Sequence, residues 1–154
     1  MNKTRGYLIF LALIFFNIFS PVILYAEETI FVNQNALGAG NGSSWEDAFL
    51  TLGDALAIGQ PGDAVWVAAG TYIENNTLIS GVKLYGGFAG TETDLSQRDA
   101  TIHTTILDGG MADSILVVAD EADETTVIDG FTITNGDAEQ GGGIRCGKDS
   151  MPSI

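Results

Sequence analysis

Two aspartates recur in nearly identical local sequences, and their spacing is the best in this chain for catalysis. Asp108 is the fourth residue of Thr-Ile-Leu-Asp-Gly at 105–109, and Asp129 is the fourth residue of Thr-Val-Ile-Asp-Gly at 126–130. If successive turns of a coiled chain stacked these segments, the two carboxylates would lie about 5 Å apart, as in a retaining glycosidase. Each aspartate also precedes a glycine, where an Asp side chain can cap its own turn. We favour turn capping and expect no catalytic residue here.

A second acidic segment could hold a cation. Asp120, Glu121, Asp123 and Glu124 place four carboxylates within five residues, and Ca²⁺ prefers such oxygen ligands. Their spacing matches neither an EF-hand loop nor a calcium-binding nonapeptide repeat. A solvated turn between strands is the favoured interpretation, with Ca²⁺ at these four residues as the alternative. No other cofactor or metal is expected.

The elements that would position these carboxylates are short apolar segments ending in turn residues. The return of one sequence after 21 positions predicts an all-β solenoid, a parallel β-helix of about four coils over 64–154. In that arrangement Ile106 would stack on Val127, and Leu107 on Ile128. A β-sandwich also has short strands and frequent turns, but it does not require a sequence to recur.

One helix is expected before the coils. Apolar residues recur at helical spacing over 45–58, Ser44 is a suitable N-cap, and Gly59 and Pro61 follow the last turn. With a preceding strand and a glycine-rich loop, this helix forms an expected N-terminal cap at 27–63. Solenoids need such caps because an open end exposes both the core and unpaired strand edges.

The first 26 residues have the order of a secretory signal peptide: a basic start, an apolar run, a breaker, and Ala26 before two glutamates. An uncleaved membrane anchor is the alternative. We expect cleavage after Ala26, no membrane span afterwards, and a secreted or cell-surface protein. The 154-residue chain has 20 acidic and 6 basic residues and a net charge of −14. Such a surface repels nucleic acid and anionic membranes, which excludes both as partners.

Several motifs, taken in order, resemble a known family. The motifs are Gly40–Trp45, Val65–Tyr72, Thr105–Gly109 and Asp129–Ile133. Over nearly all of 29–146 the chain resembles the N-terminal part of secreted bacterial right-handed parallel β-helix proteins with the pectin-lyase-like fold. The resemblance implies that fold, with the helix as its cap. It also implies a secreted or cell-surface protein associated with a bacterial outer membrane.

Two further segments add to the resemblance. Gly141–Ile144 is similar to the repeat of polymorphic outer membrane proteins, although the Phe-x-x-Asn element that accompanies it is missing. Ser150–Ile154 resembles the entry into another coil. We therefore expect the coils to be truncated at residue 154 and the natural protein to be longer.

The resemblance implies two functions of different classes. One is a structural or adhesin-like segment of a surface protein, with a polysaccharide or a host or cell surface as its partner. The other is the N-terminal portion of a polysaccharide lyase or glycoside hydrolase whose catalytic coils lie beyond residue 154. A lyase needs a base, and Lys83 and Arg98 are not accompanied by a recognisable carboxylate cluster. Arg98 looks like a structural arginine paired with a carboxylate or with carbonyls. We expect this chain to have no catalytic activity of its own.

Overall fold

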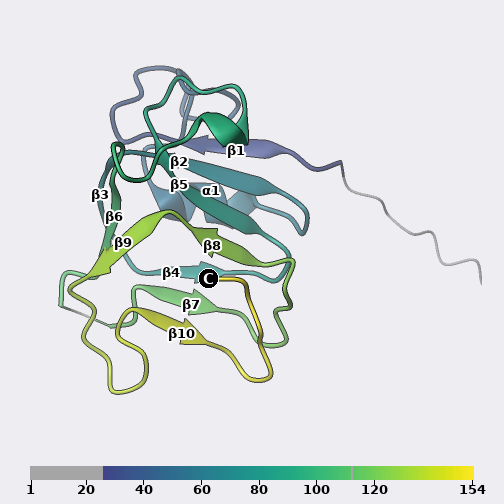
Figure 1. Ribbon diagram of the computed structural model, residues 1–154, viewed down its shortest axis with the longest axis vertical. Helices are drawn as coiled ribbons and strands as arrows, with labels where there is room; N and C mark the ends of the chain where they lie inside the picture. The colour runs from purple at the N-terminus through teal and green to yellow at the C-terminus, as the bar shows by residue number, and fades with distance from the viewer. Residues whose placement is uncertain (1–25, 112) are drawn as a thin grey trace, which may run out of the picture.

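The chain folds as a parallel β-helix with one short helix. The computed structural model describes residues 26–111 and 113–154, so the expected signal peptide lies almost wholly outside the described residues. Three parallel sheets surround the core: sheet A has the order β1-β2-β5-β8, sheet B β3-β6-β9, and sheet C β4-β7-β10 (Figure 1). No helix among the described residues is long and apolar enough to cross a membrane. The elements are β1 (Thr29–Val32), α1 (Leu52–Ile58), β2 (Ala64–Ala68), β3 (Gly70–Ile73), β4 (Asn76–Leu78), β5 (Lys83–Phe88), η1 (Leu95–Gln97), β6 (Thr105–Asp108), β7 (Leu116–Val118), β8 (Val127–Asp129), β9 (Phe131–Thr134) and β10 (Ile144–Cys146).

Each coil contributes one strand to each sheet. The coils are β2-β3-β4, β5-β6-β7 and β8-β9-β10, so the described chain has three coils where the sequence predicted about four. β1 precedes the first coil on sheet A, and Ser153 bridges back to Val127 at the sheet's other edge. The coils differ in length because the turns between strands differ. Ala64 pairs with Lys83, but Lys83 pairs with the much more distant Val127.

The two repeated segments do not stack on each other, so that expectation was wrong. Thr105–Asp108 is β6 of sheet B, where Leu107 pairs with Ile133. The second copy contains β8 of sheet A, where Ile128 pairs with Leu84. The cause is that a short strand ending in Asp-Gly suits a sharp corner wherever one occurs. The same local chemistry therefore serves two different sheets.

The N-terminal helix is shorter than the apolar spacing predicted. It spans Leu52–Ile58 instead of 45–58, and its N-cap is Thr51, whose Oγ1 accepts a hydrogen bond from the amide of Asp54 at 3.1 Å. Ser44 caps only a turn, through a 3.1 Å bond from the amide of Asp47. Residues 45–50 are not helical because this segment hydrogen-bonds to the exposed edge of β1. Phe49 N donates to Phe31 O at 2.9 Å. Pairing with an exposed edge strand outweighs the weak helical preference of this segment.

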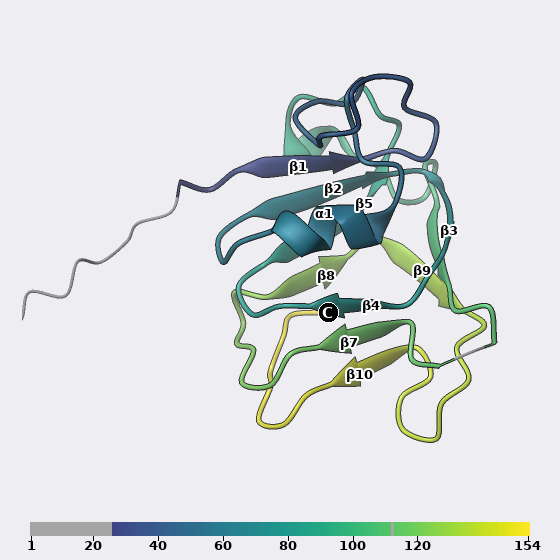
Figure 2. The ribbon, with the colours of Figure 1, turned by 180° about the vertical axis from the view of Figure 1, so that it is seen from behind.

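The helix and the loop before it do cap the first coil. Figure 2 shows α1 directly above β4, in the place that another strand of sheet C would take. Its Leu52 and Ala55 are fully buried. Glu74 anchors the start of the helix by accepting hydrogen bonds from the amides of Leu52 and Gly53, at 2.9 and 2.8 Å.

An aliphatic core fills the space between the three sheets. Most of its members are alternate residues of the strands, which point inward because strand side chains alternate between faces. They include Val65, Leu84, Leu107, Leu116 and Val118, each no more than 1% exposed. Burying one such side chain contributes about 1.5–3 kcal/mol, so the core supplies most of the stabilisation of the fold.

Candidate functional site

A second cluster of apolar side chains covers the outer face of sheet A. Register places Phe31 of β1, Trp66 of β2 and Tyr85 of β5 side by side on neighbouring strands. Phe88 stacks on Trp66, with ring centroids 4.7 Å apart. A sheet face that is aromatic on its outer side is either covered by other parts of the chain or open to a ligand. Both occur here.

Two loops cover one side of this face. The loop after β1 brings Trp45 edge-on against Phe31, with centroids 4.8 Å apart. The loop after β5 brings Glu92, whose carbonyl oxygen accepts a 2.8 Å hydrogen bond from Nε1 of Trp45. The two loops thereby bind each other above the aromatic cluster, and the rest of the face stays uncovered.

The Glu92 carboxylate holds the second loop in shape. It is 8% exposed and accepts hydrogen bonds from the amides of Ala89, Gly90 and Thr91, at 2.6, 3.0 and 2.9 Å. Burial acts to raise the pKa of Glu92, but the backbone N–H groups favour the ionised form more strongly, so the pKa is lowered overall. The buried charge thus fixes the loop that covers part of the aromatic cluster.

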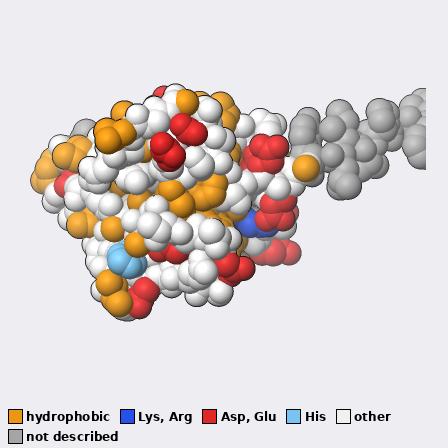
Figure 3. All heavy atoms as spheres, turned by 90° about the horizontal axis from the view of Figure 1, so that it is seen from above, with side chains coloured by type: hydrophobic (Ala, Val, Ile, Leu, Met, Phe, Trp, Pro, Cys, Tyr) orange, Lys and Arg blue, Asp and Glu red, His pale blue; other side chains and the backbone are white. Residues whose placement is uncertain are grey.

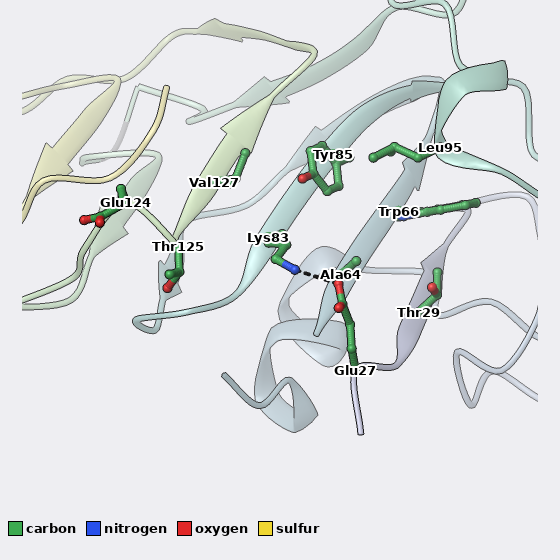
Figure 4. A pocket seen from close by; sticks show the side chains of 10 residues that line it. All are labelled: Glu27, Thr29, Ala64, Trp66, Lys83, Tyr85, Leu95, Glu124, Thr125 and Val127. Atoms are coloured by element: carbon green, nitrogen blue, oxygen red, sulfur yellow. Dashed lines mark hydrogen bonds and ion pairs between the residues drawn. The ribbon is translucent and has the colours of Figure 1, made fainter. Parts of the chain in front are cut away.

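The open region is a groove of about 640 Å³ along the outer face of sheet A (Figure 4). Its floor is mostly apolar and its rim carries hydroxyl and charged groups. One ion pair lies in the groove: Lys83 Nζ and Glu27 Oε1 are 2.6 Å apart. Ten residues line the groove: Glu27, Thr29, Ala64, Trp66, Lys83, Tyr85, Leu95, Glu124, Thr125 and Val127.

Arg98 contacts Tyr85, one of the residues that line the groove. Its Nη1 donates to the carbonyl oxygen of Gly86 at 3.1 Å, its Nη2 pairs with Asp129, and its guanidinium lies 5.1 Å from the centre of the Tyr85 ring. The sequence-based expectation of a structural arginine is confirmed. The contact also orients Tyr85, because a guanidinium over an aromatic face is attractive.

The stacked pair of aspartates suggested by the repeat is not formed. Asp108 lies in sheet B beside Thr134, whereas Asp129 lies in sheet A beside Tyr85. Asp108 caps its own corner as expected, because its Oδ1 accepts from the amide of Gly110 at 2.8 Å. Its Oδ2 accepts from Asn135 Nδ2 at 2.9 Å. Asp129 caps no corner and is bound to Arg98 instead.

Two of the four clustered carboxylates, Asp120 and Asp123, bind different backbone amides. Asp120 Oδ1 accepts from the amide of Lys148 at 2.8 Å, and Asp123 Oδ1 accepts from the amide of Thr125 at 3.0 Å. Glu121 takes a left-handed backbone with φ of 58°, and Glu124 lies at the rim of the groove. Within residues 26–111 and 113–154, no group of three or more His, Cys, Asp or Glu side chains is arranged to hold a metal ion.

Comparison with protein-family models, curated proteins and solved structures found no significant match to this chain. The evidence for the parallel β-helix is the in-register pairing of its strands. The groove was not predicted from the sequence, because Glu27, Trp66 and Tyr85 are far apart along the chain. One signal was available: Val65-Trp66-Val67 is apolar on both faces of its strand, so its outward residue had to be covered or to contact a ligand.

Proposed function

We propose that this chain is a structural or adhesin-like segment of a secreted or cell-surface bacterial protein, with no catalytic activity of its own. The observation that carries the proposal is that four of the candidate carboxylates are already bound to other groups of the chain. Asp108 and Asp123 hold turns, Asp120 holds a neighbouring loop, and Asp129 holds Arg98. Carboxylates that fix the backbone in this way are not free to act as a general acid or base at a substrate.

Other properties support a structural role. Three short sheets around a continuous aliphatic core make a rigid body. Acidic side chains outnumber basic ones on the face seen in Figure 3, as suits a soluble protein outside the cell. The proposed partner is a polysaccharide or another cell surface, and the expected signal peptide supplies the route of export.

Two experiments test this proposal. The first expresses the 154-residue chain in a Gram-negative host and sequences the N-terminus of the exported protein. We expect export and a new N-terminus at Glu27; retention of the uncleaved chain in the cytoplasm would refute the secreted role.

The second experiment incubates the purified chain with polygalacturonate and Ca²⁺ and follows the ultraviolet absorbance of unsaturated products. A parallel assay measures new reducing ends on neutral glycans. We expect no product in either assay. Unsaturated product from polygalacturonate would replace the structural proposal with a lyase. New reducing ends on a neutral glycan that disappear in the variants Asp108→Asn or Asp129→Asn would replace it with a glycosidase.

A further inference from the structure

Two Asn-Gly pairs occur in the chain, and their surroundings differ. They are Asn41-Gly42, in the loop after β1, and Asn135-Gly136, directly after β9. In such a pair the glycine nitrogen can attack the asparagine side chain, because glycine has no Cβ to shield it. Asparagine is accordingly among the thermolabile residues of proteins. Whether the attack occurs in a folded protein depends on what holds the two reacting groups.

At Asn41-Gly42 both reacting groups are held by hydrogen bonds. The amide N–H of Gly42 donates to the carbonyl oxygen of Asp47 at 2.8 Å. The side-chain oxygen of Asn41 accepts from the amide of Ser43 at 3.0 Å. Gly42 is also buried, and a Cβ there would lie 2.6 Å from the Phe49 ring, so this backbone has little room to rearrange. The fold therefore protects Asn41.

At Asn135-Gly136 the attacking nitrogen is not held. Among residues 26–111 and 113–154, the amide N–H of Gly136 has no hydrogen-bond acceptor and the side-chain oxygen of Asn135 has no donor. A single side-chain hydrogen bond remains, from Asn135 Nδ2 to Asp108 Oδ2 at 2.9 Å. Asn135 is also exposed to solvent. Its carboxamide can therefore turn toward the glycine nitrogen once that one bond opens.

The corner after β9 favours these two residue types. Asn135 has a φ of 58°, in the left-handed region that asparagine tolerates better than most residues do. A Cβ on Gly136 would lie 1.8 Å from the carbonyl oxygen of Gly142, so a larger residue does not fit without a shift of the backbone. The geometry of the corner thus selects a chemically labile pair.

We propose that Asn135 is a site of spontaneous deamidation in the folded protein. The Gly136 nitrogen bonds to Cγ of Asn135, the Cγ–Nδ2 bond breaks, and the proton of the Gly136 amide leaves with Nδ2 as ammonia. The product is a cyclic succinimide. Water then opens the ring at one of its two carbonyl carbons, returns a proton to the nitrogen, and leaves aspartate or isoaspartate at this position. The step needs no oxidant, reductant or enzyme, and it is independent of the proposed structural role.

Either product weakens the contact between β6 and β9 at this corner. Asp108 ends β6 and pairs with Thr134 of β9 (Figure 1). Deamidation removes the Nδ2 donor and adds a second carboxylate at the corner, where it repels Asp108. Isoaspartate also adds a carbon atom to the backbone, which displaces the Asn135 carbonyl that accepts a 2.8 Å bond from the amide of Met111. The modified corner should therefore open more readily.

The test follows both Asn-Gly pairs in one sample of the purified chain. The protein is incubated at mildly alkaline pH, either folded or unfolded in guanidinium chloride, and peptide mapping by mass spectrometry measures the acid form at each site over time. An isoaspartyl methyltransferase assay measures isoaspartate in the same peptides. In the unfolded chain we expect both sites to convert at similar rates. In the folded chain we expect conversion at Asn135, more slowly than in the unfolded chain, and little at Asn41.

Two variants separate the chemistry from its consequence. Asn135→Gln should abolish the acid form at this site, since the longer side chain does not close the ring readily. Asn135→Asp reproduces the charge of the product. It should lower the melting temperature and speed the amide exchange of Gly109 and Met111, whose N–H groups bond to Thr134 and Asn135.

The matched control is Asn41→Asp. It makes the same change in charge and keeps an oxygen that can accept from the amide of Ser43, so stability and exchange should stay as in the wild type.

Two results would overturn the site. One is an absence of conversion at Asn135 in the folded chain while the unfolded chain converts. The other is equal conversion of Asn41 and Asn135 in the folded chain, because the fold would then make no difference between them. An Asn135→Asp variant with the stability and amide exchange of the wild type would refute the weakening of the corner.

Discussion

Replacing Glu92 by glutamine should destabilise the protein more than any exposed charge change. The glutamate carboxylate accepts three backbone hydrogen bonds: Oε1 from Ala89, and Oε2 from Gly90 and Thr91. Glutamine has one acceptor oxygen. That oxygen can keep the two amides on the Oε2 side, but the amide nitrogen would then face the N–H of Ala89.

The expected cost follows from these contacts. A buried donor left without an acceptor costs about 1–3 kcal/mol, and the two remaining bonds lose the strengthening that a charge provides. Together we expect a loss of about 2–3 kcal/mol at pH 7. For a domain of this size that corresponds to a decrease of about 8–12 °C in the melting temperature.

The pH dependence supplies an independent check. The pKa of Glu92 is lowered in the folded protein. The stability contributed by the ionised Glu92 carboxylate is therefore fully present above its pKa in the unfolded chain, about 4.3. It is lost as the pH falls through the lower pKa of the folded protein. The gap between the wild type and Glu92→Gln should narrow as the pH falls below about 4.3.

The assay is thermal and urea unfolding followed by circular dichroism from pH 3 to pH 8. Glu46→Gln is the control, because Glu46 is exposed and the substitution makes the same change in net charge. The control should stay within about 0.5 kcal/mol of the wild type. A Glu92→Gln variant as stable as the control at pH 7, or one with as large a loss of stability at pH 3 as at pH 7, would refute the role assigned to the carboxylate.

Three further predictions test the core, the buried tyrosine and the cap. Leu107→Ala should cost about 2–5 kcal/mol in urea unfolding because Leu107 is 1% exposed; an equal loss in Ile106→Ala, on the outward face of the same strand, would contradict the alternation. Burial raises the pKa of Tyr72 to about 12. The stability that the neutral Tyr72 side chain contributes to the folded protein is therefore complete below pH 10 and is lost as the pH rises through 12. A plot of the free energy of unfolding against pH should fall less steeply in this range for Tyr72→Phe than for the wild type. Glu74→Gln removes a charged acceptor from the first two amides of α1 and should lower stability by about 1–2 kcal/mol, with faster amide exchange in the helix; unchanged exchange there would refute the anchoring role.

The short strands and the turns that end them were largely predicted from the sequence. Apolar residues at alternate positions predicted short strands, and turn residues marked their ends. The corner role of Asp108 and the structural role of Arg98 followed from residue types and neighbours, and both are confirmed. These features depend on contacts between a side chain and the backbone nearby, or on a charge that needs a partner.

Features that depend on which segments meet were predicted poorly. The repeat at 21 positions suggested that Asp108 and Asp129 stack, yet they lie in different sheets. The helix was expected at 45–58, but the edge of β1 competes for residues up to Phe49. Loops of unequal length between strands also reduced the expected four coils to three.

The candidate site also depends on which segments of the chain meet. Each lining residue is ordinary in its own sequence context. The register of β1, β2, β5 and β8, together with the segments next to these strands, brings them into one groove.

The sequence by itself determined that this chain forms short strands and that a helix precedes the coils. Those properties follow from hydrophobic alternation and turn chemistry, which act over a few residues. The parallel solenoid was predicted correctly, but from a repeat whose two copies lie in different sheets. The tertiary structure alone decided the register, the extent of the cap and the position of the groove. Stacking in a β-helix is set by loop lengths and by competition for exposed edges, and both act between segments far apart in the chain.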